Sequence, residues 1–129
     1  MENTENKKIY EEFSIEGKSI IYIDLSHIRT VEKFSAVFEK IKRAIAAHPE
    51  HSLYTITNIE GSVIDTHSKD AFIKYIEHNK PYVIKGALMG ADGVAKIVSA
   101  EMTNKTERDK FHIAFTKEKA IEWILQQDN

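Results

Sequence analysis

The chain has 129 residues, with 18 lysines and arginines, 20 aspartates and glutamates, and no cysteine. Its net charge of -2 and its interleaved charges argue against a general nucleic-acid binder, which needs a basic surface to displace counterions from phosphates. The lack of cysteine excludes disulfides, thiolate nucleophiles and thiolate metal sites. A hydrophobic fraction of 42% suits one domain, which we expect to span residues 8–127 after a disordered tail of residues 1–7.

Hydropathy gives no sign of a targeting or membrane segment. The longest apolar runs, such as IIYI at 20–23, are far shorter than a helix that crosses a bilayer. The first ten residues, MENTENKKIY, lack the apolar centre of a secretory signal. We therefore expect a cytoplasmic protein with no integral membrane segment.

The first two predicted elements form a hairpin. Two apolar segments, IYEEFSI (9–15) and SIIYIDL (19–25), flank a short connection that contains glycine, which is typical of antiparallel strands. The second segment is apolar except for Asp24 and is therefore predicted to be buried in the middle of the sheet.

A helix is predicted next, because Thr30 stands at an N-cap position, Glu32 falls in the first turn and Pro49 ends the pattern. Its apolar residues recur at helical spacing: Val31, Phe34, Phe38, Ile41 and Ile45.

The rest of the chain alternates between strand and helix patterns. The predicted order is a strand at 52–59, a helix at 68–79, a strand at 82–89, a helix with the stripe Val94, Ile97, Val98 and Met102, a strand at 111–116, and a final helix capped by Thr116. The fold prediction is thus α/β in the order ββαβαβαβα, with a five-stranded mixed sheet, four helices and parallel crossovers.

Two glycines in the segment KPYVIKGALMGADGVAKIVSAEM (80–102) raise the question of a phosphate site. A strand, a turn with Gly90 and Gly93, and a helix start can together bind an anion. However, neither nucleotide signature is present, and Asp92 would cap the helix and repel a phosphate. The favoured interpretation is a structural turn, and no cofactor is predicted.

A second candidate site is the cluster Asp65, Thr66 and Ser68, where a loop enters a predicted helix. A hydroxyl group there is either an N-cap or a phosphorylation site, and a phosphate would be tolerated by the helix dipole. His67 lies beside the cluster, but adjacency in sequence does not establish a Ser-His-acid triad.

Two further groups contain residue types that are common in functional sites. His48, Glu50 and His51 are interrupted by Pro49, so we expect a surface loop there and not a metal site. Trp123 lies beside an apolar helical stripe, which leaves a groove or a homodimer contact open.

The segments NKPYVIKGALMGADGVAKIV (79–98) and FTKEKAIEWIL (115–125) resemble the SpoIIAA-like families, small domains related to STAS and CRAL-TRIO domains. For STAS-type proteins, the resemblance implies a phosphorylatable serine in an Asp-Ser-[Ser/Thr]-Gly loop at the start of the second helix. Here that place has Asp65, Thr66, His67, Ser68 and Lys69, so the adjacent serine and the glycine are missing. The choice between Thr66 and Ser68 as phosphoacceptor stays open.

These observations predict a non-enzymatic binding or regulatory module that acts through a protein partner. Its binding face would combine the loop at 65–68 with the turn at 90–93. The alternative is a carrier or sensor of a small apolar or lipid-like ligand, which would need a concavity lined by Phe72, Met89 and Val94. An enzyme would need His67, Asp65 and a hydroxyl group to converge in a cleft.

Overall fold

The computed structural model describes residues 9–90, 111–114 and 116–126 of the chain. Five strands in these ranges form one sheet, and their spatial order follows the sequence: β1 (Tyr10–Ile15), β2 (Lys18–Asp24), β3 (Leu53–Asn58), β4 (Val83–Met89) and β5 (Phe111–Ala114). β1 is antiparallel to β2, whereas β2, β3, β4 and β5 are parallel. The predicted α/β class and five-stranded mixed sheet are confirmed.

The predicted hairpin between β1 and β2 is confirmed, and it closes with the two residues Glu16 and Gly17, because Lys18, expected in the connection, already belongs to β2. Their φ angles are 52° and 80°, and two positive values in succession give the turn a twist that matches the two strands. The turn therefore fixes the register, in which Ile15 lies opposite Lys18.

The prediction that β2 is the middle strand is wrong, because β3 has that place. β1 is the edge strand on one side of β2. The later strands β3, β4 and β5 all lie on the other side of β2, so β2 is the second strand from that edge. β2 is still buried from both faces: Ile21 packs beneath the helices of one layer, and Ile20 belongs to the cluster on the other face.

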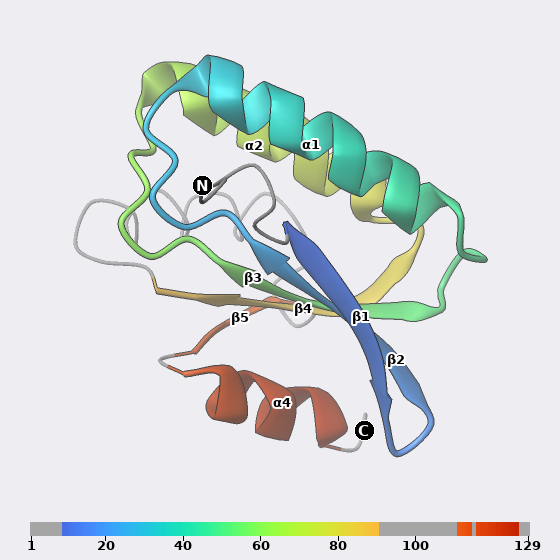
Figure 1. The fold of residues 1–129 in the computed structure, drawn as a ribbon. Helices are drawn as coiled ribbons and strands as arrows, with labels where there is room; N and C mark the ends of the chain where they lie inside the picture. The colour runs from blue at the N-terminus through green and yellow to red at the C-terminus, as the bar shows by residue number, and fades with distance from the viewer. Residues whose placement is uncertain (1–8, 91–110, 115, 127–129) are drawn as a thin grey trace, which may run out of the picture.

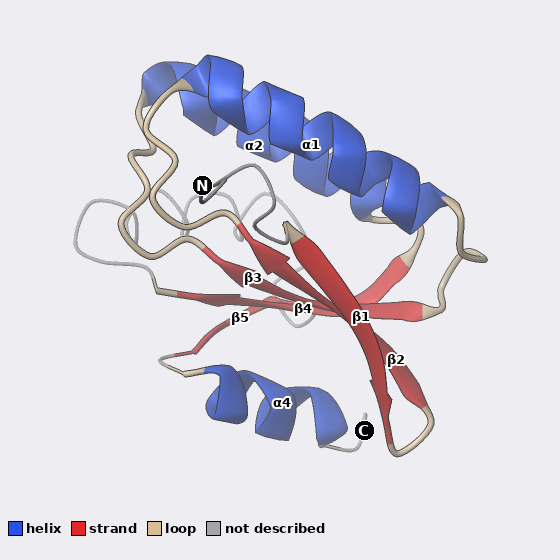
Figure 2. Ribbon diagram, in the orientation of Figure 1, coloured by secondary structure: helices blue, strands red, loops and turns tan. Residues whose placement is uncertain are grey.

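Helices cover both faces of the sheet (Figure 1). α1 (Val31–Ala46) and α2 (Thr66–Asn79) lie together on one face, and α4 (Lys117–Leu125) lies on the other (Figure 2). The helix predicted around Val94 to Met102, which would be a fourth, falls outside the described residues. None of the helices within residues 9–90 and 116–126 is long and apolar enough to cross a membrane.

Both predicted threonine caps are confirmed. The hydroxyl oxygen of Thr30 accepts a hydrogen bond from the backbone N–H of Lys33 at 3.2 Å, and Thr116 accepts one from Lys119 at 3.1 Å. Each bond satisfies a backbone donor that has no partner within the helix, so these caps fix where α1 and α4 begin.

Aromatic rings form the centre of the core between α1, α2 and the sheet. The Phe72 ring lies 5.0 Å from the Phe34 ring and 5.0 Å from the Phe38 ring, in edge-on contacts. Tyr75 stacks on Phe38 with 4.1 Å between the ring centroids. The helical spacing of Phe34 and Phe38 predicted their burial, and the packing of these rings holds α1 against α2.

A buried lysine attaches α4 to the opposite face. The Lys85 ammonium donates hydrogen bonds to the backbone carbonyls of Trp123 and Gln126, both at 3.3 Å, and lies 5.0 Å from the Trp123 ring centroid. A cation at the carboxyl end of a helix is favourable because the last carbonyls lack intrahelical partners. Trp123, which the sequence places beside an apolar helical stripe, packs half-buried within this layer.

The hydroxyl group of Tyr75 is buried in the aromatic core and has no hydrogen-bond partner among the described residues. Burial raises its pKa, and the Asn79 amide, which lies near it but outside hydrogen-bond geometry, offsets this only in part. An unsatisfied buried hydroxyl destabilises a fold. Tyr75→Phe should therefore leave the free energy of unfolding unchanged or raise it by up to about 1 kcal/mol.

Urea unfolding followed by circular dichroism measures this effect. Tyr82→Phe is the matched control, because Tyr82 is only half-buried and its hydroxyl group is not among the buried groups that lack a partner. A loss of more than about 1 kcal/mol in Tyr75→Phe would mean that the hydroxyl makes a stabilising hydrogen bond after all.

Candidate functional site

The carboxyl ends of the parallel strands meet at one edge of the sheet, where ligands and partners collect in open α/β folds. Two loops project there: residues 25–30 after β2 and residues 59–65 after β3. With the first residues of α2, they form what we call the carboxyl-edge surface. Its exposed residues are His27, Arg29, Thr30, Glu60, Gly61, Val63, Asp65, Thr66 and His67.

Hydrogen bonds join the two loops to each other. The N–H of His27 donates to the carbonyl of Glu60, and the N–H of Val63 donates to the carbonyl of Ile28, both at 2.9 Å. The buried Ser62 hydroxyl lies 2.9 Å from the Leu25 carbonyl. The loops therefore hold each other in one conformation.

The last residues of β2 and β3 shape the start of each loop. The carboxylate of Asp24 accepts hydrogen bonds from the N–H of Ser26 at 3.0 Å and from its hydroxyl at 2.6 Å. The side-chain oxygen of Asn58 accepts one from the N–H of Glu60 at 2.9 Å. Asp24 and Asn58 lie opposite each other in the register, so two matching turns begin side by side.

His27 has a backbone conformation that is uncommon for a residue with a side chain, with φ of 61°. Its ring lies over Gly61, where an added Cβ would overlap it. Such conformations cost free energy and persist where the surrounding structure enforces them, as the bond from His27 to Glu60 does.

Gly90, one of the predicted site residues, lies at the end of β4 against the loop that follows β3. Its φ is 81°, and an added Cβ would lie 2.7 Å from both the Asn58 side-chain oxygen and the Glu60 nitrogen. The structure thus brings Gly90 to the carboxyl-edge surface as a close backbone contact. Asp92 and Gly93, the other predicted residues of that turn, lie outside the described residues.

The cluster at the start of α2 separates into a cap and an exposed hydroxyl. Asp65 is the N-cap, and one of its carboxylate oxygens accepts the N–H groups of His67 and Ser68, both at 3.0 Å. The Ser68 hydroxyl oxygen in turn accepts the N–H of Asp65 at 2.8 Å, and Ser68 is 1% exposed. Thr66, in contrast, is exposed in the first turn of the helix.

The capping bonds change how Asp65 titrates. The N–H of Ser68 is the main cause that holds the pKa of Asp65 below its ordinary value of 3.8; burial opposes this, while the Ser68 hydroxyl and His67 support it. Because the folded state favours the carboxylate, its stabilisation is present above the unfolded pKa and is lost as the pH falls through the folded one.

Asp65→Asn should therefore lower the melting temperature at pH 7, and the difference from the unmodified protein should shrink from about pH 4 downward. Thermal unfolding by circular dichroism at several pH values measures it. Asp70→Asn is the control, because it makes the same charge change at an exposed position farther along α2. An equal difference between Asp65→Asn and the unmodified protein at pH 7 and at about pH 3 would contradict the role of the charge.

Within this cluster, Ser68 is committed to the helix cap and is not available as the hydroxyl group of a triad. Asp65 and Ser68 are bonded to each other and to the backbone, and the burial of Ser68 keeps its hydroxyl from a substrate. Among residues 9–90, 113–114 and 116–126, no group of three histidines, aspartates or glutamates could hold a metal ion. His48 instead pairs with Glu12, with 3.2 Å from Nε2 to Oε1.

The concavity expected for an apolar ligand cannot be built from the residues predicted to line it. Phe72 is buried in the core under α1 and α2, whereas Met89 packs on the α4 face. The sheet lies between them, so they cannot line one cavity. Val94 lies outside the described residues.

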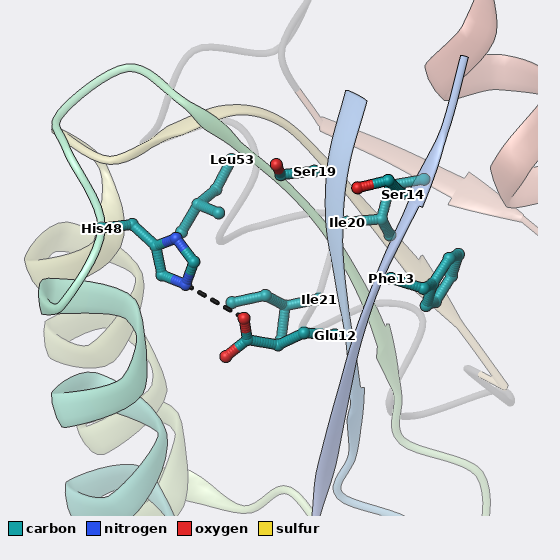
Figure 3. Close-up of a pocket in the computed structure, with 8 residues that line it drawn as sticks. All are labelled: Glu12, Phe13, Ser14, Ser19, Ile20, Ile21, His48 and Leu53. Atoms are coloured by element: carbon teal, nitrogen blue, oxygen red, sulfur yellow. Dashed lines mark ion pairs between the residues drawn. The ribbon is translucent and has the colours of Figure 1, made fainter. Parts of the chain in front are cut away.

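The structure has a pocket that the sequence did not predict, at the opposite end of the parallel strands (Figure 3). It has a volume of about 180 Å³, and it opens between the β1–β2 hairpin and the connection after α1. Its lining is Glu12, Phe13, Ser14, Ser19, Ile20, Ile21, His48 and Leu53. The hairpin register alone could have placed Glu12 and Ser14 beside Ile21 and Ser19, but no sequence pattern indicated that His48 joins them.

Comparison with known proteins gives no family. No protein-family model matches the chain, and no curated protein matches it at a significant level.

Proposed function

We propose that this protein is a non-enzymatic binding module that acts through a protein partner, and that the carboxyl-edge surface is where the partner binds. The observation that carries the proposal is the set of hydrogen bonds between the loops at 25–30 and 59–65. Loops already held in one conformation lose little entropy on association, which favours binding.

The exposed side chains of this surface suit a protein partner. Val63 is 37% exposed and is one of two large apolar side chains that are exposed among the described residues. The exposed polar residues His27, Glu60 and His67 belong to the same surface. The groups that shape the loops, Asp24 and Ser62 among them, accept or donate internal hydrogen bonds. This division between internal support and exposed contact residues is typical of a recognition surface.

Thr66 is our proposed control point on this surface. Its hydroxyl is exposed in the first turn of α2, where the helix dipole favours negative charge, while Ser68 is committed to the cap. A phosphate would add a charge of about −1.5 to −2 and change which partners the surface accepts. The proposal includes a cytoplasmic location, where protein kinases act.

The proposal also includes a distant relationship to the SpoIIAA-like families. The order of strands and helices up to β4 supports it, as does the position of residues 65–69 at the start of α2, where the resemblance implies the phosphorylatable loop.

The phosphorylation part is tested by mass spectrometry of protein purified from its own cells under several growth conditions. We expect phosphate on Thr66 and none on Ser68, and Thr66→Ala should abolish it. Phosphate on Ser68, or no phosphate under any condition, would overturn Thr66 as the control point. Circular dichroism of Thr66→Ala serves as the folding control, because an exposed side chain should be replaceable without loss of structure.

A further inference from the structure

β1 is an edge strand whose outer side has no strand beside it within the described residues. The N–H of Asp24 bonds to the carbonyl of Ile9, which sets the alternation of the ladder. In an antiparallel pair, every second residue bonds to its partner, so Tyr10, Glu12 and Ser14 direct their backbone N–H and C=O groups away from β2. These groups are the ones that a further strand would pair with.

Two of these three residues, Glu12 and Ser14, also line the pocket. Glu12 and Ser14 lie opposite Ile21 and Ser19, so their side chains stand on the face that α1 and α2 cover. Figure 3 shows Glu12 and His48 pointing toward one another across this space, with Ser14 and Ser19 beyond them. A strand added to β1 would thus have the pocket directly beside every second side chain.

The charges of the hairpin indicate what such a strand would carry. Glu11, Glu12 and Glu16 are exposed, and the Glu12 side chain is 44% exposed despite its ion pair with His48. Strand β1 contains no lysine or proline and its register is unbroken, so two common barriers to edge pairing are absent. Pairing of two copies through β1 would bring glutamates together, which is unfavourable.

We propose that the free edge of β1 and the adjacent pocket form a docking site for an extended basic peptide segment of a partner protein. The segment pairs its backbone with Tyr10, Glu12 and Ser14 and places an arginine or lysine side chain at the Glu12 carboxylate. Its alternate side chains are apolar, because they lie beside Phe13 and Ile15 on the other face. The pocket lies at the opposite end of the parallel strands from the carboxyl-edge surface, and the docking site shares no residue with that surface.

The test uses the full ¹⁵N-labelled chain and a capped hexapeptide that alternates arginine and valine. We expect saturable shifts of the amide resonances of Tyr10, Glu12 and Ser14, with slower hydrogen exchange at these three amides. The same peptide with glutamate in place of arginine should not bind. The proposal is overturned if hydrogen exchange at these three amides is not slowed by millimolar concentrations of the arginine peptide. It is also overturned if the glutamate peptide binds as tightly as the arginine peptide.

Two variants separate the backbone pairing from the charge. Ser14→Pro removes an outward N–H that β2 does not use and should abolish binding. Glu12→Gln should weaken it about two- to fivefold, whereas Glu39→Gln, the same change on the outer surface of α1, should not. Unchanged binding by folded Ser14→Pro contradicts strand addition, and unchanged binding by Glu12→Gln contradicts the basic anchor.

Analytical ultracentrifugation of the unmodified chain tests whether a second copy of the chain, and not a peptide, pairs with the edge of β1. We expect a monomer at the concentrations used for NMR. A dimer that Ser14→Pro converts to monomer would assign the edge to a second copy of the chain and overturn the peptide site.

Discussion

Replacing Phe72 with alanine is expected to lower the free energy of unfolding by about 3–5 kcal/mol. The ring is 2% exposed and makes edge-on contacts with Phe34 and Phe38 from α1, so its removal leaves a cavity where α1, α2 and the sheet meet. Because whole domains are stable by only about 5–15 kcal/mol, this one change removes a large part of the total. Urea unfolding followed by circular dichroism measures it.

Two controls make the result specific. Phe72→Leu keeps most of the volume and should cost clearly less than the alanine variant. Tyr10→Ala removes an aromatic ring that is 36% exposed on β1 and should cost about 1 kcal/mol or less. If Phe72→Ala were no more destabilising than Tyr10→Ala, the aromatic cluster would not be the centre of the core.

Gly90→Ala is expected to be the second most damaging change. A φ of 81° already disfavours any side chain by about 1–2 kcal/mol, and the added Cβ would also meet Asn58 and the backbone nitrogen of Glu60 at 2.7 Å. The backbone cannot move aside as a flexible side chain can. We therefore expect overpacking to lower the free energy of unfolding by about 1–3 kcal/mol more.

Gly17→Ala is the matched control, because Gly17 has nearly the same φ, 80°, and nothing within 4 Å of an added Cβ. The difference between the two variants therefore isolates the close approach of Gly90 to the loop after β3. Equal losses in Gly17→Ala and Gly90→Ala would show that the close approach of Gly90 to the loop after β3 does not contribute to stability.

Most of the fold followed from local sequence patterns. The helical spacing of Phe34, Phe38 and Ile41, the caps Thr30 and Thr116, and the Glu16–Gly17 turn each act over a few residues, so they can be identified without knowledge of tertiary contacts. The order of the strands in the sheet could not be obtained this way. Apolar composition indicates burial, but β2 and β3 are both buried, so composition alone did not distinguish the middle strand from its neighbour.

The candidate site was predictable only in part. The sequence placed Asp65, Thr66 and Ser68 at a helix start, but which side chain became the cap depended on backbone geometry. That geometry uses Asp65 as the acceptor and buries Ser68, which leaves Thr66 exposed. The loop at 25–30, which contains His27, was not singled out, because its role arises from hydrogen bonds to a segment more than thirty residues away.

The residues of the pocket were even harder to predict from the sequence. Glu12 and His48 are separated by the whole of β2 and α1, and only the folding of α1 across the sheet brings them to 3.2 Å. A positively charged or polar residue in the connection after α1 is common and carries no signal by itself. Strand alternation could have identified Glu12 and Ser14 as sharing a face, which is half of the proposed peptide site.

Photo-crosslinking in the protein's own cells shows directly whether the carboxyl-edge surface binds a protein partner. A photoreactive amino acid is placed in turn at Val63, at His67 and, as an exposed control on α1, at Lys40. We expect Val63 and His67 to crosslink to the same protein, Lys40 not to crosslink to it, and Thr66→Glu to change the yield. Crosslinks from Lys40 alone, or none from Val63 and His67, would contradict partner binding at the carboxyl-edge surface.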